Sequence, residues 1–418
     1  MRRAEPFRLD AAYSFLDSLF RFGHSNSELA HWTAGVRFEP VSATVAFKSN
    51  STVDISSMTH AHHGNPETLL SVIIPAYNVE HFIVASLESA LSQPRADEIE
   101  LIVIDDGSTD LTLERILDVQ RSGRAPNMRV IHQENRGVSA ARNRAIAEAT
   151  SPYIGFLDSD DVWSADFTAK IMPLLDAATA DIIEFNVGII DSDGKVIDKV
   201  TLIDPATVGH RACDLDALLD FARVYQVFPV ARVYKRELWN GIEFPTGRVY
   251  EDAAAIPLVY ARATSLFRLA DDLYFYRRRA GSITTKATPN TVTSLATCAE
   301  ETMERCNGDA LDPFWLAMFH KVFSYACHQA ARVDTPAFAQ SMRTIEATAA
   351  RYRRFAASRN DTPKELRFHR KIVVDRRWFQ AKRMVKRALG MELRPPSAAR
   401  AHASAKASTR SHASVSRD

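Results

Sequence analysis

Strand-like and helix-like patterns alternate along the first part of the chain. Residues 69–75 form an almost continuous apolar run that stops at a proline, which is typical of a strand covered on both faces. Between residues 79 and 93 the apolar positions recur at helical spacing instead. The alternation continues with strands predicted over 100–105, 128–132 and 153–157, and with helices over 111–119 and 139–149. Four such repeats predict an α/β fold with a doubly wound, mostly parallel sheet and helices on both faces.

The pattern becomes less regular after the fourth strand. Residues 181–190 and 195–202 have a hairpin pattern around the turn Asp191-Ser192-Asp193-Gly194. We expect a helix over 251–263, two short strands over 266–269 and 273–276, and a helical C-terminal region from about residue 290 to 358. We also expect Ser139 to be the N-cap of the helix that begins there.

Composition limits the class of protein. The 418 residues are enough for two or three folding units. The 52 basic and 51 acidic residues give a net charge of +1, so the whole chain is not a polyanion binder. The cysteines form no CxxC pair, which argues against a disulfide framework or a zinc site and for a reducing compartment. With no apolar run of membrane-spanning length and no signal-peptide pattern, we expect a cytoplasmic protein.

Polar and aromatic residues follow the predicted strands. The four segments are Pro75-Ala76-Tyr77-Asn78, Asp105-Asp106, Asn135-Arg136-Gly137 and Asp158-Ser159-Asp160-Asp161. Ligands of such sheets bind beyond the carboxyl ends of the strands, so these segments should share one site. Tyr77 would stack on a planar base, Asp105 or Asp106 would accept from a base N–H or a ribose hydroxyl, and Arg142 would neutralise phosphate.

The acidic turn at 158–161 allows two interpretations. Three carboxylates at a strand exit repel one another unless a positive group is present, and a divalent cation carrying a phosphorylated ligand would satisfy them. The alternative is an exposed acidic turn that caps the next helix. The chain has neither GxGxxG after the first strand nor GxxxxGK[ST], so the dinucleotide fingerprint and the P-loop are excluded.

Four segments in order closely resemble the pattern of glycosyltransferase family 2, which has the GT-A fold. They are SVIIPAYNVE (71–80), DDGSTD (105–110), NRGVSAARN (135–143) and YIGFLDSDD (153–161). Later segments agree, namely DIIEFN (181–186), VYKRELW (233–239), GIEFPTGRVYEDAA (241–254) and YRRRAGSIT (276–284). The resemblance covers residues 69–285, roughly half of the chain.

The resemblance implies roles for individual residues. The nucleoside would be held by Pro75, Tyr77, Asn78 and Asp106, with Asp105 as a further candidate. The DxD-type motif would hold Mn²⁺ or Mg²⁺ and the ribose through Asp158 and Asp160. The acidic pair Glu251–Asp252 would supply the catalytic base, and we expect Asp252 to be that base. On the residues alone, this pair could equally be a charged helix N-terminus.

The implied reaction is inverting, metal-dependent transfer of a hexosyl or N-acetylhexosaminyl group. The donor would be a nucleotide-diphosphate sugar, with UDP as the expected nucleotide, and the acceptor a hydroxyl of a glycan or lipid-linked molecule in cell-surface polysaccharide synthesis. One alternative is a sugar-1-phosphate nucleotidyltransferase, which should have a Gly-rich basic loop where PAYN stands. Another is a non-catalytic nucleotide-sugar-binding subunit, which should lack the DxD motif or the later acidic pair.

Two positions depart from the common pattern of the family. Arg144-Ala145 stands where a glycine is usual after the ARN segment, and alanine is small enough to keep the packing. The run Arg277-Arg278-Arg279 is more basic than the family requires. One of these arginines would reach the diphosphate or an anionic acceptor, or the run is a solvated charged surface.

The expected domains follow from these patterns. They are an N-terminal extension and linker (1–67), the GT-A catalytic domain (68–290), a helical region (291–394) and a disordered basic tail (395–418). Within the helical region, residues 364–387 have the pattern of a basic amphipathic helix. That helix would lie on an anionic membrane at the inner face of the plasma membrane, or pack on the catalytic domain. No nucleic-acid partner is expected, because no reading motif accompanies the charge.

Overall fold

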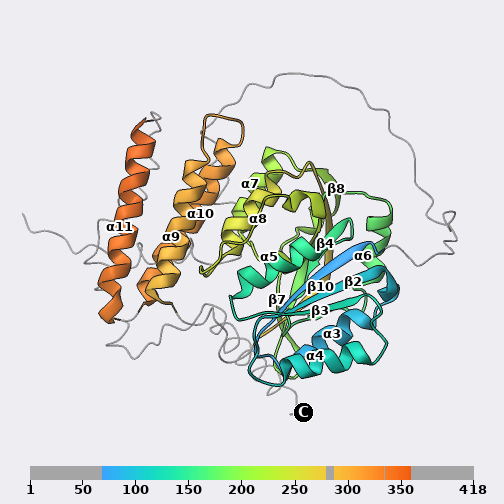
Figure 1. Cartoon of the computed structure of the whole chain (residues 1–418). Helices are drawn as coiled ribbons and strands as arrows, with labels where there is room; N and C mark the ends of the chain where they lie inside the picture. Colours follow the sequence, from blue (N-terminus) through green and yellow to red (C-terminus); the bar gives the residue numbers. More distant parts are fainter. Residues whose placement is uncertain (1–67, 279–286, 334, 359–418) are drawn as a thin grey trace, which may run out of the picture. The chain divides into compact units, whose positions relative to one another are not determined.

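One mixed sheet of ten strands runs through the part of the chain that the structure describes (Figure 1). The structure is a computed structural model and describes residues 68–278, 287–333 and 335–358. The strands lie in the order β3-β2-β1-β4-β9-β6-β10-β5, while β7 pairs with β6 and β8 with β10. Their bounds are β1 Leu70–Ala76, β2 Ile99–Asp105, β3 Met128–His132, β4 Tyr153–Phe156, β5 Val162–Trp163, β6 Ile182–Ile190, β7 Val196–Val200, β8 Gly209–Ala212, β9 Arg232–Lys235 and β10 Ser265–Arg277.

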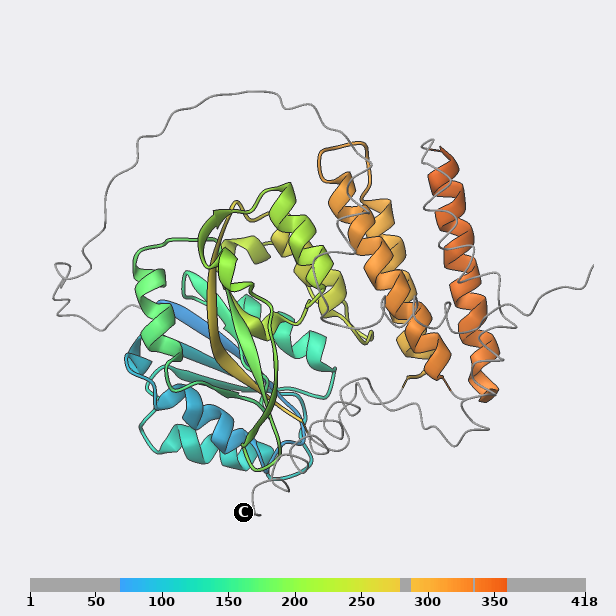
Figure 2. The same cartoon turned by 180° about the vertical axis from the view of Figure 1, so that it is seen from behind.

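Helices cover both faces of this sheet and continue beyond it. They are α3 Ile83–Leu91, α4 Thr112–Arg121, α5 Val138–Glu148, α6 Phe167–Asp176, α7 Leu215–Val224, α8 Asp252–Tyr260, α9 Pro289–Glu304, α10 Asp312–Arg332 and α11 Thr335–Ser358. Short 3₁₀ turns occupy Ala96–Glu98, Pro205–Thr207, Pro229–Ala231 and Arg236–Trp239. Figures 1 and 2 show α3 and α4 on one face of the parallel strands and α5 on the other. The predicted doubly wound arrangement with a helical C-terminal region is confirmed.

The first four strands are parallel and end at one edge. β1 pairs with β2 from Leu70 opposite Ile99 to Ala76 opposite Asp105. On its other side β1 pairs with β4, but only as far as Ile73 opposite Phe156. Pro75 lies in β1 beyond that point and is buried. Proline has no backbone N–H, and at this position the missing N–H would face the side on which β4 has already ended. Proline can therefore stand inside this central strand without breaking a ladder bond.

The second half of the sheet is mixed. β9 is antiparallel to both β4 and β6, whereas β6 and β10 are parallel. The predicted hairpin is confirmed as β6 and β7, which pair antiparallel. The two short strands predicted over 266–269 and 273–276 are wrong, since β10 is one strand of 13 residues. Register shifts around Asp272 absorb its polar middle, and pairing with β6 resumes on both sides.

The start of α5 also differs from the prediction. Its N-cap is Gly137 rather than Ser139, which is buried inside the first turn. Gly137 has a φ of 87°, a backbone conformation that favours glycine, and its N–H is bound by Asp106. The start of α5 is therefore fixed by Asp106, which follows β2, and not by the hydroxyl of Ser139.

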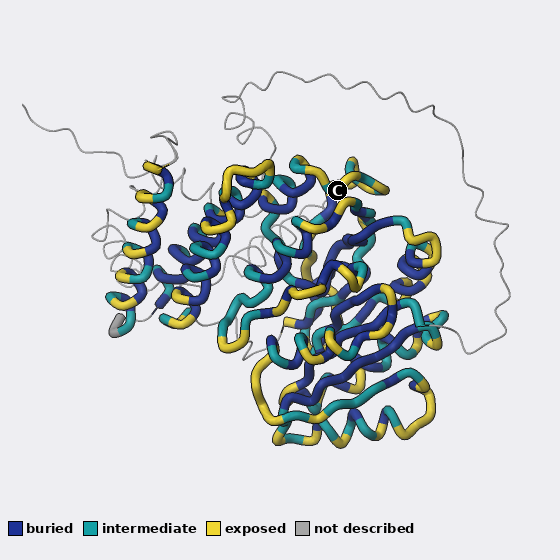
Figure 3. The backbone as a smooth tube through the Cα atoms, turned by 45° about the horizontal axis from the view of Figure 1, so that its top comes forward, coloured by how far each residue is buried: buried dark blue, intermediate teal, exposed yellow. Residues whose placement is uncertain are grey.

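The helical region has its own buried stripe. The predicted stripe on α10 is buried, and α10 packs against α9, α11 and α7. Thr288 and Thr291 form a capping box that starts α9. Figure 3 shows that the burial of these helices alternates from one side to the other, as amphipathic helices require. Within the described residues, no helix has the length and apolar character to cross a membrane. The predictions for residues 1–67, 364–387 and 395–418 lie outside the described residues.

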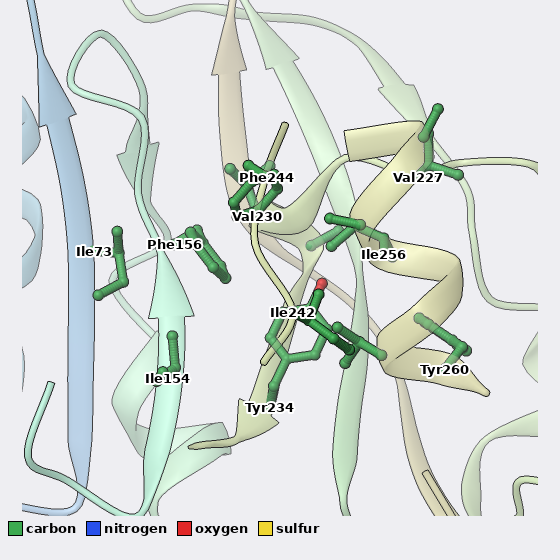
Figure 4. Packing of buried hydrophobic residues seen from close by; sticks show 14 of the residues in the cluster. Ile73, Ile154, Phe156, Val227, Val230, Tyr234, Ile242, Phe244, Ile256 and Tyr260 are labelled. Atoms are coloured by element: carbon green, nitrogen blue, oxygen red, sulfur yellow. The ribbon is translucent and has the colours of Figure 1, made fainter. Parts of the chain in front are cut away.

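Aromatic residues join the two halves of the sheet. Phe156 at the end of β4 lies with its ring centroid 5.3 Å from that of Trp239 and 5.8 Å from that of Phe244. Figure 4 shows Phe156 in the same interior as Phe244 and Ile256 of α8. Phe244 is almost fully buried, so the loop before α8 is anchored in the core.

A buried ionic cluster crosses β6, β9 and β10. Glu184 accepts a hydrogen bond from Nε of Arg268 at 2.8 Å and another from the Tyr260 hydroxyl. Arg232 lies 3.5 Å from the same carboxylate and stacks over the ring of Tyr260. Burial raises the pKa of Glu184, but the two arginines outweigh it and hold the pKa below its ordinary value. The carboxylate is therefore ionised and fully paired.

We expect Glu184→Gln to lower the free energy of unfolding by about 3 kcal/mol, because it leaves two buried guanidinium groups without their counter-charge. Urea unfolding followed by circular dichroism measures the change. Glu148→Gln is the control, since its ion pair with Arg129 is about 40% exposed and should contribute less than about 1 kcal/mol. Equal effects of the two substitutions would contradict the prediction.

Candidate active site

Asp161, the third carboxylate of the acidic turn after β4, has a structural role. Asp161 is buried, and its two oxygens accept hydrogen bonds from the Tyr274 hydroxyl at 2.6 Å and from the backbone N–H of Arg277 at 2.7 Å. Burial, followed by repulsion from Asp160 and Asp158, raises the pKa of Asp161 well above its usual range. Asp161 therefore fastens the turn to β10.

The other two carboxylates of the turn, Asp158 and Asp160, are partly exposed. The side chain of Asp158 is 32% exposed, and its Oδ1 accepts from Nη2 of Arg142 at 2.8 Å. The backbone carbonyl of Asp160 accepts from Nε of Arg277 at 2.9 Å, which fixes the turn at that residue. Both predicted metal ligands thus lie on a rigid turn that solvent and ligands can reach.

Arg142 links this turn to the predicted catalytic pair. Its Nη1 donates to Oε1 of Glu251 at 2.6 Å while Nη2 holds Asp158. The side chain is only 6% exposed, and its guanidinium lies over the ring of Phe244, 5.4 Å from the centroid. Burial lowers the pKa of Arg142, but the carboxylates of Asp158 and Glu251 outweigh it and raise the pKa overall. The expectation that Arg142 meets phosphate differs from this geometry, because two carboxylates already engage its guanidinium.

Asn143, the residue after Arg142 in α5, positions the loop that precedes Glu251 and Asp252. Nδ2 of Asn143 donates to the carbonyl of Phe244 at 2.8 Å, and the N–H of Phe244 donates back to Oδ1 of Asn143 at 2.8 Å. Arg142 and Asn143 therefore bind the loop at two points. This gives a physical role to the ARN segment at 141–143, which the sequence alone shows only as a pattern.

Asp252 is the first residue of α8 and lies beside the bridge. Its Oδ1 accepts from the N–H of Ala253 at 2.8 Å. Burial, and then the charge of Glu251, raise the pKa of Asp252 to about 7, although Arg142 acts in the opposite direction. A carboxylate with such a pKa can exchange a proton near neutral pH, as a general base must.

The turn after β1 presents one free aromatic ring. Tyr77 is 47% exposed. Asn78 has a φ of 50°, its Oδ1 accepts from the N–H of Thr109 at 2.8 Å, and its own N–H donates to Oγ of Ser108 at 3.1 Å. Asn78 therefore ties the turn after β1 to the loop after β2, and this leaves Tyr77 at the surface as a platform.

The two aspartates at the end of β2 are both buried. Asp106 accepts hydrogen bonds from Gln133 and from the N–H groups of Arg136 and Gly137, at 2.7 to 2.9 Å. Oδ2 of Asp105 lies 2.6 Å from Nδ1 of His132, and its Oδ1 is buried without a hydrogen-bond partner among the described residues.

This burial differs from the expectation that Asp105, Asp106 and Pro75 contact a nucleoside directly. The loop after β3 takes the oxygens of Asp106, and Pro75 lies inside its strand. Gly107 keeps the two loops in close contact, because a Cβ there would lie 2.7 Å from the backbone nitrogen of Asn135. Tyr77 and His132, in contrast, are exposed at this edge of the sheet.

The arginines after β10 have separate roles. Arg277 is buried, and its Nε and Nη1 donate to the carbonyls of Asp160, Asp191 and Ser192, so these two nitrogens bind the protein's own backbone. Arg278 is exposed, and Arg279 lies outside the described residues. Sequence reasoning missed Tyr274 and assigned Arg277 to an anion or to a solvated surface, whereas both residues fix the acidic turn. Their signal, a tyrosine and an arginine near the end of a strand, is too common to be recognised.

We expect Arg142→Met to reduce the free energy of unfolding by about 3 kcal/mol, because two partly buried carboxylates lose their shared cation. Combining it with Glu251→Gln should recover part of the loss, with a coupling of about 1 to 3 kcal/mol in a double-mutant cycle measured by urea unfolding. Arg136→Met, which removes an exposed side chain from the same segment, is the control. Strictly additive losses would show that the bridge contributes nothing.

Comparisons with known proteins identify the family of the chain. The model of the family "Glycosyl transferase family 2" matches residues 71–241. Glycosyltransferase GlyG of Streptococcus pneumoniae serotype 4 is 34% identical over 227 residues, which are 51% of this chain and 72% of that protein. Chondroitin synthase of Escherichia coli is 46% identical over 98 residues, 23% of this chain and 14% of the synthase. GlyG apart, seven further curated relatives are each matched over less than two thirds of their length.

A solved structure shows the same fold. Residues 1–349 of S. aureus TarS, crystallised with UDP-GlcNAc, align with 78% of this chain and 93% of that one, with a TM-score of 0.59 and 21% identity. The likeness at this identity concerns the architecture, a GT-A sheet followed by helices. Together with the family model and the identity to GlyG, it establishes that the chain belongs to glycosyltransferase family 2.

Proposed function

We propose that the chain transfers a sugar from a nucleotide-diphosphate sugar to a hydroxyl of a glycan or lipid-linked acceptor, with inversion at the anomeric carbon. The observation that carries this proposal is the ion bridge formed by Arg142. Its single guanidinium binds both Asp158 of the acidic turn and Glu251, the neighbour of Asp252 in sequence. A donor at the turn and a proton acceptor at the start of α8 would then meet the same reacting atoms. We propose residues 68–290 as the catalytic domain and 291–394 as a helical region that supports it.

The class of donor is inferred from relatives as well as from the site. TarS was crystallised with UDP-GlcNAc, and the chondroitin synthases among the relatives support a polysaccharide as the product class. A UDP-hexose or UDP-N-acetylhexosamine is therefore the donor that we propose. The exposed ring of Tyr77 would stack on the base, and the loops joined by Asn78 and Asp106 would shape its pocket.

The charge of the site favours a divalent cation. Three carboxylates, those of Asp158, Glu251 and Asp252, act on the guanidinium of Arg142, Asp160 lies on the same turn as Asp158, and a diphosphate would add further negative charge. Among the described residues no three acidic, histidine or cysteine side chains gather at metal-binding distance. Asp158 and Asp160 thus fit an ion that takes one or two carboxylates and completes its shell with substrate phosphates and water, as Mg²⁺ does. When bound, such an ion would neutralise the charge of the diphosphate leaving group.

The residues of the chain supply the remaining chemistry. Asp252 accepts the proton of the acceptor hydroxyl as that oxygen bonds to the anomeric carbon. The bond from the anomeric carbon to the diphosphate oxygen breaks in the same step, and the nucleoside diphosphate departs from the opposite face. Glu251 keeps Arg142 oriented and raises the proton affinity of Asp252. A single displacement of this kind inverts the anomeric configuration.

A donor screen tests the proposal. The full chain is incubated with Mn²⁺, a panel of UDP- and GDP-sugars and a simple glycan acceptor, and release of the nucleoside diphosphate is followed. Release from a UDP-sugar, with an inverted linkage in the product by NMR, is the expected result. Absence of release from every donor, or a product with retained configuration, would reject the proposal.

Two substitutions should separate donor binding from transfer. Asp252→Asn removes the base and should abolish transfer while leaving the calorimetric donor affinity unchanged. Asp160→Asn removes a metal-binding oxygen and should weaken donor affinity in Mn²⁺ by about tenfold or more. Asp271→Asn, which alters a partly exposed aspartate paired with Lys170, is the control and should change neither quantity. Retained transfer by Asp252→Asn would place the base elsewhere.

The pH dependence of transfer should reflect the raised pKa of Asp252. Since the carboxylate must be ionised to accept a proton, kcat/KM should be constant well above pH 7 and fall about tenfold per pH unit below it. Glu251→Gln removes the charge that raises this pKa, so the fall should begin at a lower pH. The exposed Glu134→Gln is the control and should leave the profile in place. A profile unaffected by Glu251→Gln would show that another group titrates.

A further inference from the structure

The residue before the acidic pair has a strained backbone. Tyr250 has a φ of 60°, a left-handed conformation that a bulky side chain adopts at an energetic cost. The chain then passes directly into Glu251 and Asp252, so the conformation of Tyr250 sets where these carboxylates point. Such a conformation persists only where surrounding contacts hold it.

The contacts that hold this residue come from the helical region. The Tyr250 hydroxyl lies 3.4 Å from the Tyr325 hydroxyl of α10 and accepts from Nε2 of Gln329, also at 3.4 Å. The rings of Tyr250 and Tyr325 meet edge to face with centroids 5.4 Å apart. Gln329 is 1% exposed, so its amide is directed by packing and not by solvent.

A second contact with this segment comes from α9. It is made with Arg248, two residues before Tyr250. Nη1 of Arg248 donates to Oε1 of Glu301 at 2.7 Å. The same helix also packs against α8, which Asp252 begins. Two helices thus reach the segment 248–252 from independent positions.

We propose that Glu301, Tyr325 and Gln329 are positioning residues, through which α9 and α10 hold the segment 248–252 and aim Asp252 at the acceptor hydroxyl. The inference rests on the proposed function, since it assigns Asp252 as the base. It gives the helical region a part in the transfer step, because the contacts of Glu301, Tyr325 and Gln329 reach the loop before α8. Packing of a hydrophobic core alone would not require these three polar contacts.

The test combines Tyr325→Phe with Glu301→Gln in the full chain and uses two readouts. The first is hydrogen exchange of the backbone amides in residues 247–253, which should become faster. The second is transfer kinetics, in which kcat should fall about tenfold while the donor KM stays within about twofold. Tyr352→Phe is the matched control, because it removes a hydroxyl at the same 3.4 Å distance, from His320, between α11 and α10.

Each result decides one point. Unchanged exchange in residues 247–253 would overturn the inference, whether or not the enzyme is active. Faster exchange with unchanged kcat would show that the contacts are structural and would also overturn it, as would equal effects of Tyr352→Phe. A wild-type chain without turnover of any donor would reject the proposed function instead, while the exchange data would still show whether the helices hold the segment.

Discussion

The ion bridge of Arg142 is the interaction on which the arrangement of the site depends. One guanidinium, almost fully buried, joins the acidic turn after β4 to Glu251 at the start of α8, which lies 109 residues from Arg142 in sequence. A buried cation needs opposite charge nearby, and buried carboxylates need a cation, so neither side of the bridge is stable without the other. The bridge therefore sets the separation between the carboxylates at the donor end and the pair that includes the proposed base.

The position of Arg142 follows from the packing of α5. Ala141 and Ala145 are fully buried against β1 and β2, and these small side chains let the helix approach the sheet closely. Arg142 then leaves the helix toward the sheet edge, and Asn143 reaches the loop at Phe244. Ala145 stands where glycine is usual in the family, and its complete burial shows that one methyl group is accommodated there.

Periodicity predicted much of the fold, because buried parallel strands and amphipathic helices have distinctive patterns. It failed where pairing overrides local preference. The aspartates Asp271 and Asp272 suggest a break, yet pairing with β6 keeps β10 continuous through a register shift. β5, β8 and β9 have two to four residues each, too few for any period to appear.

The candidate site was predictable as a set of residues but not as a set of contacts. The positions of Asp158, Asp160 and Asp252 follow from motif order, whereas the engagement of Asp106 by a neighbouring loop depends on a close approach at Gly107. The same holds for Arg142, since a sequence pattern cannot tell whether an arginine meets phosphate or carboxylate. Distances between segments decide that, and the distances arise only when the two halves of the sheet pack together.

The acidic turn is the place where those halves meet. Its Asp158 is bound from α5 by Arg142, while Asp161 and the carbonyl of Asp160 are bound from β10 by Tyr274 and Arg277. Because both sides hold the turn, Asp158 and Asp160 can remain partly exposed and close together without the loop rearranging to separate them. In the proposed function, a bound cation would relieve the repulsion between these carboxylates and prepare the turn for a diphosphate donor.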